Sequence, residues 1–279
     1  MRIHIIVDST TDLTDTIRER VSVVPLTVCF GTEEYTDGVN LTHKEFYEKL
    51  IESDTLPTTS QAAPAAFMKL FDSCLEPGDS AIVITLSSSL SGTYQSAVIA
   101  AGEYENIFVV DSCSVAIGTA ILTEYALSCL EQGMPAIDIV AALEEKKKDI
   151  CLIAMLDTLE YLKKGGRISS TAAFAGGLLN IKPVVNIENG IINILGKARG
   201  SRQGNNLLIQ EITKAGGIDF SMPILLGYTG LTDVLLKKYI EDSKTLWENG
   251  TGNLRYTSIG SVVGTHTGPG VIAAAFFKK

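Results

Sequence analysis

The stretch at residues 81–93, AIVITLSSSLSGT, restricts the possible folds more than any other part of the sequence. Its first six residues are largely apolar and rich in β-branched side chains, and they follow a Pro-Gly-Asp turn, so they predict a buried strand. Four of the next five residues are serines, and Gly92 then opens a predicted helix that runs to about Tyr104. A hydroxyl-rich turn between a parallel strand and a helix gathers free N–H and O–H groups at the positive end of the helix dipole. The turn is therefore a candidate anion site, although any single serine in it could simply cap the helix.

Two further predicted strands, at residues 3–7 and 107–110, end in the same tripeptide, Val-Asp-Ser. The aspartates of these two tripeptides are Asp8 and Asp111. Strands that alternate with helices of about ten or more residues imply βαβ crossovers and a mostly parallel sheet. Ligands of such sheets bind beyond the carboxyl ends of the strands. We therefore expect an α/β fold with a mostly parallel sheet flanked by helices, and a polar site at one edge of that sheet.

The pattern changes near residue 150, where we expect a second domain to begin. Short apolar runs at 184–187 and 191–195 flank an Asn-Gly pair, which is a strong signal for a β-hairpin. An antiparallel hairpin after a series of βα units is typical of an α+β arrangement. We therefore predict two closely packed domains, an α/β domain at residues 1–150 and an α+β domain with an antiparallel sheet at 151–279.

Several shorter elements are predicted from their capping and turn residues. Thr42 and Glu45 have the spacing of a capping box at the start of a helix. The remaining expectations are a turn at 35–38, a loop at 56–61, a helix at 171–179, a loop at 198–202, a strand-like segment at 254–263 and a glycine-rich loop, GTHTGPG, at 264–270 before an apolar tail.

The composition argues against several classes of protein. The formal net charge is −9 and Lys and Arg form no long run, whereas nucleic-acid binding needs basic patches. Five widely spaced cysteines without a CxxC motif fit a reducing compartment. The N-terminus lacks the pattern of a signal peptide, and no apolar run is long enough for a membrane span. We therefore expect a soluble cytoplasmic protein without a nucleic-acid partner.

The histidines give no support for a metal site. His4, His43 and His266 share no metal-ligand spacing, so we expect neither a metal nor another cofactor. A serine hydrolase is an alternative, because Ser91 lies on a strand-to-helix turn and His266 could serve as its base. A nucleophile elbow, however, needs glycine two residues before the serine, and that position is Ser89. Hydrolysis is therefore a minor alternative.

Four residues outside the serine turn have both a structural and a functional interpretation. A lone histidine is more often structural, but glycines surround His266, which indicates close approach of the backbone and makes a ligand contact an alternative role. Thr59 lies before a predicted helix, Arg167 follows a Gly-Gly pair, and Arg202 lies in a predicted loop. Each of these three could contact a ligand or a partner, or could instead cap a helix or face solvent.

Seven short blocks occur in order along nearly the whole chain. They are VDSTTDL at 7–13, PTTSQ at 57–61, SSLSGTYQ at 88–95, VDS at 110–112, YLKKGGRIS at 161–169, LNIKP at 179–183 and GTHTGPG at 264–270. Together these blocks resemble the DegV family, and several blocks in order are far more specific than any one of them. The best-understood members of that family are the FakB fatty-acid-binding proteins of bacteria.

The resemblance implies a protein that holds one long-chain fatty acid in a buried tunnel between two domains. Such a protein is not itself an enzyme and has no catalytic residues. It presents the acyl carboxylate to an ATP-dependent fatty acid kinase subunit, which makes acyl phosphate for phospholipid synthesis. By the same resemblance, Thr59 and Ser91 would hydrogen-bond the carboxylate and His266 would lie beside it. Arg167 and Arg202 would then serve phosphotransfer or contact with the partner.

The resemblance leaves room for other functions and contacts. One rival is a serine acyl hydrolase that uses Ser91 and His266, and another is a sensor of a different apolar carboxylate. Side chains at 171–179 are candidates for the end of the tunnel. Without a transmembrane segment, any contact with a membrane would be transient.

Overall fold

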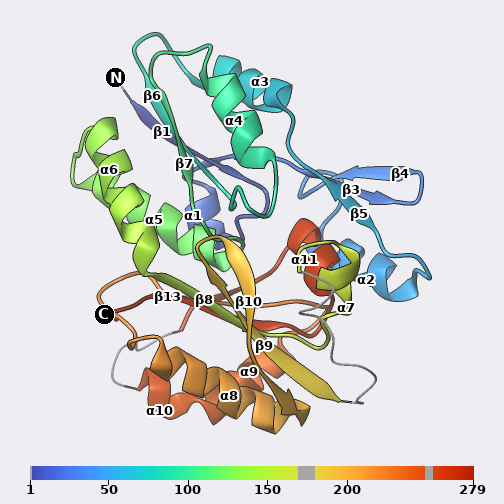
Figure 1. Cartoon of the computed structure of the whole chain (residues 1–279). Helices are drawn as coiled ribbons and strands as arrows, with labels where there is room; N and C mark the ends of the chain where they lie inside the picture. Colours follow the sequence, from blue (N-terminus) through green and yellow to red (C-terminus); the bar gives the residue numbers. More distant parts are fainter. Residues whose placement is uncertain (1, 169–179, 249–253) are drawn as a thin grey trace.

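The computed structural model describes residues 2–168, 180–248 and 254–279, and each half of the chain contributes one large β-sheet (Figure 1). The first sheet has the strand order β2-β1-β6-β7, and all of its ladders are parallel. Its strands are β1 (Ile3–Asp8), β2 (Ser22–Val24), β6 (Ser80–Thr85) and β7 (Ile107–Asp111). The predicted parallel sheet is confirmed, with β6 in its interior between β1 and β7.

Helices cover both faces of the first sheet, which explains why its strands are continuous apolar runs. They are α3 (Pro64–Cys74) and α4 (Thr93–Ala101) on one face and α5 (Ile117–Glu131) and α6 (Ala136–Lys146) on the other (Figure 1). Along β6, Ile82 and Ile84 pack towards α5 and α6, whereas Ala81 and Val83 pack towards α3 and α4. Side chains that alternate along β6 therefore pack into two separate hydrophobic cores, one on each face of the sheet.

A small antiparallel sheet with the order β4-β3-β5 extends from the first half. This region comprises β3 (Thr27–Phe30), β4 (Glu33–Thr36), α2 (His43–Glu52) and β5 (Thr58–Ser60), whereas α1 (Asp15–Arg18) follows β1 and packs with Ile17 against the core of the first sheet. The turn predicted at 35–38 and the loop predicted at 56–61 are therefore wrong in part, because each contains strand residues. Tyr35 and Thr59 both pair with Val28 of β3. Pairing with a strand elsewhere in the chain overrides the local turn signals.

The second sheet has the order β10-β9-β8-β13-β11-β12, and its ladders are antiparallel apart from that between β11 and β12. Its strands are β8 (Ile150–Met155), β9 (Ile181–Glu188), β10 (Ile191–Arg199), β11 (Leu225–Tyr228), β12 (Tyr256–Ser258) and β13 (Ile272–Phe277). The predicted mostly antiparallel sheet is confirmed. The apolar tail forms β13, whose six residues are all buried in the interior of this sheet.

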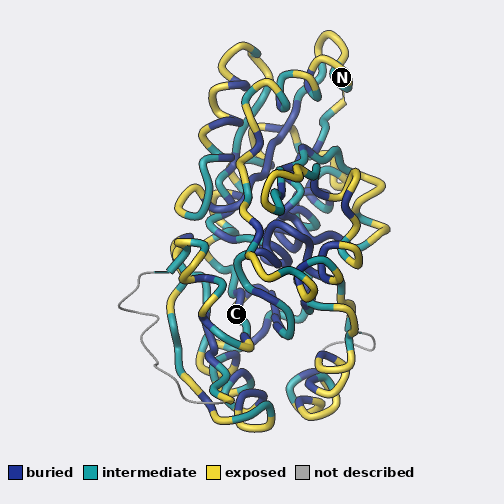
Figure 2. The backbone as a smooth tube through the Cα atoms, turned by 90° about the vertical axis from the view of Figure 1, so that its right-hand side faces the viewer, coloured by how far each residue is buried: buried dark blue, intermediate teal, exposed yellow. Residues whose placement is uncertain are grey.

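The second sheet is covered on one face by its own helices and on the other by the first half. The helices are α8 (Gly200–Lys214), α9 (Val234–Asp242) and α10 (Lys244–Trp247), and two short ones, η1 (Lys147–Asp149) and α7 (Glu160–Lys164), flank β8. The opposite face packs against α5, with Ala273, Ala275 and Phe277 in the same core as that helix. Buried segments therefore run through the middle of the molecule, and exposed loops lie at its two ends (Figure 2).

The glycine-rich loop predicted at 264–270 is wrong in part, because residues 264–267 are helical and only 268–270 form a loop. Helix α11 spans Ser261–Thr267, and the strand-like segment predicted at 254–263 contains only the short β12. Gly264 allows close packing on α2, because a Cβ at this position would lie 2.6 Å from the hydroxyl of Tyr47. Gly264 thus reflects contact with a distant helix, whereas Gly268 and Gly270, with φ values of 72° and 83°, belong to the turn before β13.

The structure also differs from the prediction at residues 198–202. Helix α8 begins at Gly200, so residues 198–202 are the end of a strand and the start of a helix instead of the predicted loop. Arg202 therefore lies in the first turn of α8. The helix predicted at 171–179 lies outside the described residues.

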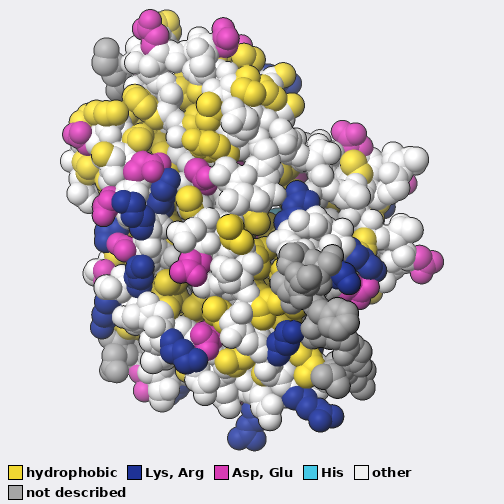
Figure 3. All heavy atoms as spheres, viewed as in Figure 1, with side chains coloured by type: hydrophobic (Ala, Val, Ile, Leu, Met, Phe, Trp, Pro, Cys, Tyr) yellow, Lys and Arg dark blue, Asp and Glu magenta, His cyan; other side chains and the backbone are white. Residues whose placement is uncertain are grey.

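The charged surface consists largely of local ion pairs. The densest basic segment is neutralised residue by residue, with Lys146 paired to Asp149, Lys147 to Glu144 and Lys148 to Glu145. Figure 3 shows Lys and Arg interspersed with Asp and Glu along one edge of the molecule. All five cysteines are free. In the ranges that the structure describes, no helix has both the length and the apolar character needed to cross a bilayer.

The β9–β10 hairpin reaches from the second sheet to the serine turn of the first half (Figure 1). Asn189 and Gly190 have φ values of 52° and 78°, which suit the tight turn that the Asn-Gly pair predicts. The hydroxyl of Ser87 donates to the carbonyl of Gly190 at 2.9 Å, and this contact is buried. A Cβ at Gly190 would lie 2.3 Å from the Ser87 hydroxyl oxygen. Glycine is thus required by both the backbone conformation and the contact between the halves.

We expect Gly190→Ala to destabilise the protein more than Gly133→Ala does. Gly133 has a similar φ of 75°, but nothing lies within 4 Å of a Cβ there, so it is a matched control for backbone strain. Strain alone costs about 1–2 kcal/mol, and loss of the buried Ser87 contact adds about 1–3 kcal/mol at Gly190. Urea unfolding measures both losses. Equal losses would contradict a tight contact between hairpin and serine turn.

Candidate ligand-binding site

A cavity of about 360 Å³ lies where the two halves meet. From the first half, Thr59 of β5, Ser91 of the serine turn and Val115 before α5 line it. From the second half, Ile192 of β10 and His266 of α11 complete the wall. This volume falls within the range of about 300–1,000 Å³ that is usual for small-molecule sites.

An apolar cavity of about 60 Å³ adjoins the larger one. The two share the lining residues Val115, Leu162, Ile192, Val263 and Thr267. Apart from Thr267, every side chain described as lining the smaller cavity is apolar. The combined space therefore has a polar end and an apolar end, which suits an elongated amphipathic molecule.

The polar end brings together residues that are far apart in the sequence. The Thr59 hydroxyl lies 2.9 Å from Nε2 of His266, across the boundary between the halves. Arg167 also crosses it, since its Nε donates to the carbonyl of Leu90 at 3.2 Å and its Nη1 to that of Gly165 at 2.7 Å. Thr59, Ser91, Arg167 and His266 thus all line one cavity.

The serine turn does not offer the free N–H groups that we predicted. Those of residues 86–91 all donate within the protein. The bonds run from Leu86 to Asp8, from Ser87 to the carbonyl of Ser114, from Ser88 to Asp111, and from Ser89, Leu90 and Ser91 to Ser87. The acceptors come from outside the turn as well as within it, which local sequence could not reveal. The N–H groups of residues 86–91 are therefore unavailable to an anion, which leaves the side-chain hydroxyls of the turn and the first turn of α4.

His266 is half-buried, and its surroundings lower its pKa so that the neutral form of the ring is favoured. Burial, and secondarily the charge of Arg167, lower its pKa from the ordinary value of 6.5 to about 4. Its ring packs on Gly165, where a Cβ would lie 2.2 Å from Nδ1, and Nδ1 has no hydrogen-bond partner among the described residues. When Nε2 carries the proton, it donates to Thr59 and leaves the hydrogen of the Thr59 hydroxyl free for a ligand. His266 then orients a donor without adding charge.

The hydrogen bonds at the polar end do not form a hydrolytic set. The Ser91 hydroxyl lies 2.9 Å from that of Thr93, and His266 is bonded to Thr59 instead of Ser91. A general base must reach the nucleophile and is usually oriented by a third group, whereas Nδ1 of His266 is unpartnered. The arrangement favours binding over acyl transfer.

Arg202 is placed apart from the other predicted residues. It is exposed in the first turn of α8 and is not among the described residues that line either cavity. The structure thus brings four of the five predicted site residues together and leaves Arg202 outside.

Gln61 is a site residue that the sequence analysis missed. It lines the cavity and donates to the Ser96 hydroxyl at 2.9 Å. It lies over Gly92, where a Cβ would lie 2.0 Å from its Oε1. The sequence contains a signal for Gln61, because Gln61 belongs to the same short block as Thr59. Its neighbour Gly92 belongs to the same block as Ser91.

The start of α11 is held by four side chains of the first half. The contacts are Tyr47 to the carbonyl of Ile259 at 2.9 Å, Asp12 to the N–H of Gly260 at 2.8 Å, His43 to the hydroxyl of Ser258 at 2.7 Å, and Asp37 to the hydroxyl of Ser261. Burial, with the nearby Asp37 and Asp8 carboxylates, raises the pKa of Asp12 well above its usual range. These contacts fix the helix that carries His266.

The two sheets and the enclosed cavity define an α/β protein whose halves together surround a small, amphipathic space. A family model described as "Uncharacterised protein, DegV family" matches residues 2–279. The chain therefore belongs to the DegV family.

Relatives in this family match the whole chain. A DegV domain-containing protein of Caldanaerobacter subterraneus is 34% identical, over 100% of this chain and 99% of that protein. A solved structure described as fatty acid binding of a DegV family protein from Thermus thermophilus is 31% identical, with a TM-score of 0.89 and complete coverage of both chains. The fatty acid kinase B3 protein of Streptococcus pneumoniae, loaded with linoleic acid, is 22% identical, with a TM-score of 0.88 and complete coverage of both chains. The last likeness shows a shared fold.

We expect the stability of the protein to fall as the pH drops from about 6.5 to about 4. In this window the unfolded chain protonates His266 and the folded protein does not, because the folded pKa is about 4. His266→Gln should lose less stability over the same window. Burial also lowers the pKa of His43, so the variant keeps part of the dependence.

Urea unfolding of wild type and His266→Gln at a series of pH values measures this effect. The difference in free energy of unfolding between the two proteins isolates His266 from the other titrating groups. A difference that stays constant between pH 6.5 and 4 would show that the folded protein does not keep His266 neutral.

Proposed function

We propose that this protein binds one long-chain fatty acid, with its carboxylate at Thr59 and Ser91 and its acyl chain in the apolar part of the cavity. The single observation that carries the proposal is the cavity itself, which is polar at one end and apolar at the other. The description of the Thermus thermophilus relative as fatty acid binding supports it. The cavity between the halves serves as the tunnel, and the two domains meet near residue 150.

The energetics of such a complex are favourable at both the polar and the apolar end of the cavity. A hydrogen bond to a charged group contributes roughly 1.5–3 kcal/mol, and Thr59 and Ser91 each offer one hydroxyl. Arg167, which lines the cavity beside them, adds a positive charge. Each buried methylene contributes roughly 0.8 kcal/mol, so the acyl chain supplies most of the affinity and the hydroxyls supply orientation.

We further propose that the bound fatty acid is presented in the cytoplasm to an ATP-dependent fatty acid kinase subunit. The kinase would make acyl phosphate for phospholipid synthesis, and this chain would supply the substrate without catalysing the step. The motif resemblance supports this role, as does the fold shared with the Streptococcus pneumoniae protein. Arg202, exposed outside the cavity, is placed to contact such a partner.

Ser91→Ala should weaken fatty acid binding by about 10- to 100-fold, because it removes one hydrogen bond to the charged carboxylate. Displacement of a fluorescent fatty acid from delipidated protein measures the affinity. Ser73→Ala is the matched control, since Ser73 is exposed on α3 and its hydroxyl donates to the carbonyl of Leu70, away from the cavity. Equal affinities of Ser91→Ala and wild type would remove Ser91 from the site.

Thr59→Ala should reduce phosphorylation more than it reduces binding. At saturating fatty acid the variant is fully loaded, so any remaining loss of acyl phosphate formation with ATP and the kinase reports orientation of the carboxylate. We expect a loss of about tenfold or more under these conditions. A loaded variant that supports the wild-type rate would contradict the presenting role of Thr59.

The acyl hydrolase alternative makes a different prediction. It requires turnover of a chromogenic acyl ester, and Ser91→Ala should abolish that turnover. Wild-type protein that binds the fatty acid but does not cleave the ester would exclude it.

A further inference from the structure

The serine turn is held from both sides by carboxylates that lie outside the cavity lining. Strand β6 lies between β1 and β7, and each of these neighbours ends in an aspartate. Asp8 of β1 accepts the N–H of Leu86 at 2.7 Å, and Asp111 of β7 accepts that of Ser88 at 3.2 Å. The repeated Val-Asp-Ser of the sequence therefore places two carboxylates on opposite sides of one turn.

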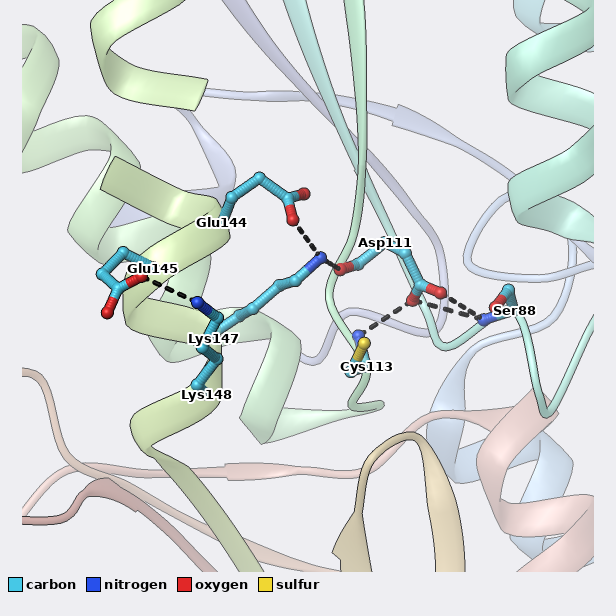
Figure 4. Close-up of polar contacts among 7 residues, drawn as sticks. All are labelled: Ser88, Asp111, Cys113, Glu144, Glu145, Lys147 and Lys148. Atoms are coloured by element: carbon cyan, nitrogen blue, oxygen red, sulfur yellow. Dashed lines mark hydrogen bonds and ion pairs between the residues drawn. The ribbon is translucent and has the colours of Figure 1, made fainter. Parts of the chain in front are cut away.

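Asp111 is itself fixed at both its backbone and its side chain (Figure 4). Its carboxylate also accepts the N–H of Cys113 at 2.8 Å. Its backbone carbonyl accepts from Nζ of Lys147 at 2.9 Å, and the same ammonium pairs with Glu144 at 2.7 Å. The Lys147 side chain is only 14% exposed, so these contacts are largely shielded from water. Asp111 thus connects η1 to the serine turn.

The loop that follows Asp111 is held in an unusual conformation. Cys113 and Ala116 have φ values of 51° and 54°, in a region that residues other than glycine rarely adopt. The Cys113 N–H bond to Asp111 and the bond from Ser87 N–H to the carbonyl of Ser114, at 2.7 Å, restrain the loop. Such conformations persist only where the surroundings determine them, and they concentrate at functional sites.

The hydrogen bonds of the two aspartates also restrain Ser91, because they hold the backbone of the turn to which Ser91 is bonded. Leu86 and Ser88, the two residues that the aspartates hold, flank Ser87. The carbonyl of Ser87 in turn accepts the N–H groups of Leu90 and Ser91 at 3.0 and 3.2 Å. The aspartates therefore set the position from which the Ser91 hydroxyl faces the cavity.

We propose that Asp111 is a positioning residue for recognition of the ligand's anionic head group. It fixes the serine turn and hence the hydroxyl of Ser91, without touching the ligand. The inference rests on the proposed function and deepens it, because it assigns head-group selectivity to a side chain outside the described cavity lining. Asp8 acts in the same way from the other side but is fully buried, whereas Asp111 is half-buried and can be replaced with less damage to the core.

The test compares a long-chain fatty acid with the alcohol of the same chain length, by displacement of the same fluorescent probe. The acyl chain contributes equally to both affinities, so their ratio reports the contacts of the carboxylate. In Asp111→Ala we expect the ratio of acid to alcohol affinity to fall by about tenfold, with the affinity for the alcohol unchanged. Asp111→Asn keeps an oxygen that can accept from Ser88, and it should restore most of the ratio.

Two further variants provide a second test of the proposal and a matched control. Lys147→Met removes the bond to the Asp111 carbonyl and should lower the ratio in the same direction, even where Asp111→Ala fails to fold. Glu145→Ala is the matched control, because Glu145 pairs with exposed Lys148 beside this cluster and has no bond to the turn (Figure 4). It should leave the ratio unchanged.

The outcomes separate this inference from the proposed function. A purely structural role for Asp111 would lower the affinities for acid and alcohol together, and that result, or an unchanged ratio, would overturn the proposal. Wild-type protein that binds neither the acid nor the alcohol would instead defeat the proposed function itself.

Discussion

The N–H groups of residues 86–91, at the carboxyl end of β6 and in the turn that follows, all donate within the protein, and these hydrogen bonds shape the rest of the site. Asp8 and Asp111 satisfy two of them from the neighbouring strands, and Ser87 satisfies three more. The turn is therefore rigid, and its side-chain hydroxyls remain for a ligand. The hairpin tip at Gly190 then covers the turn and closes the site against the second sheet.

Much of the fold could be predicted because it depends on local signals. The apolar run of β6, the capping box of Thr42 and Glu45, and the Asn-Gly turn between β9 and β10 are all present in the structure. The strand depends on the pattern of apolar side chains, the capping box on one pair of hydrogen bonds, and the turn on residues that accept a positive φ. Each is a property of a few adjacent residues. The gathering of Thr59 and His266 in one cavity came from the resemblance of ordered blocks, not from local physics.

The features that could not be predicted depend on contacts between distant residues. The glycines of α11 suggested a loop, whereas Gly264 meets Tyr47 from a helix more than two hundred residues earlier in the chain. The serines suggested free N–H groups, whereas those of Leu86, Ser87 and Ser88 donate to acceptors of other segments, two of them carboxylates of neighbouring strands. Thr59 lies in a strand because it pairs with Val28. In each case a distant partner, invisible in the local sequence, decides the outcome.

The central claim is that the cavity holds one fatty acid, and extraction of the purified protein tests it most directly. The protein is denatured in organic solvent, the extract is analysed by mass spectrometry, and native mass spectrometry of the intact protein gives the stoichiometry. The account predicts one long-chain fatty acid for each chain. Protein that is empty as purified and that also fails to take up added fatty acid would contradict it.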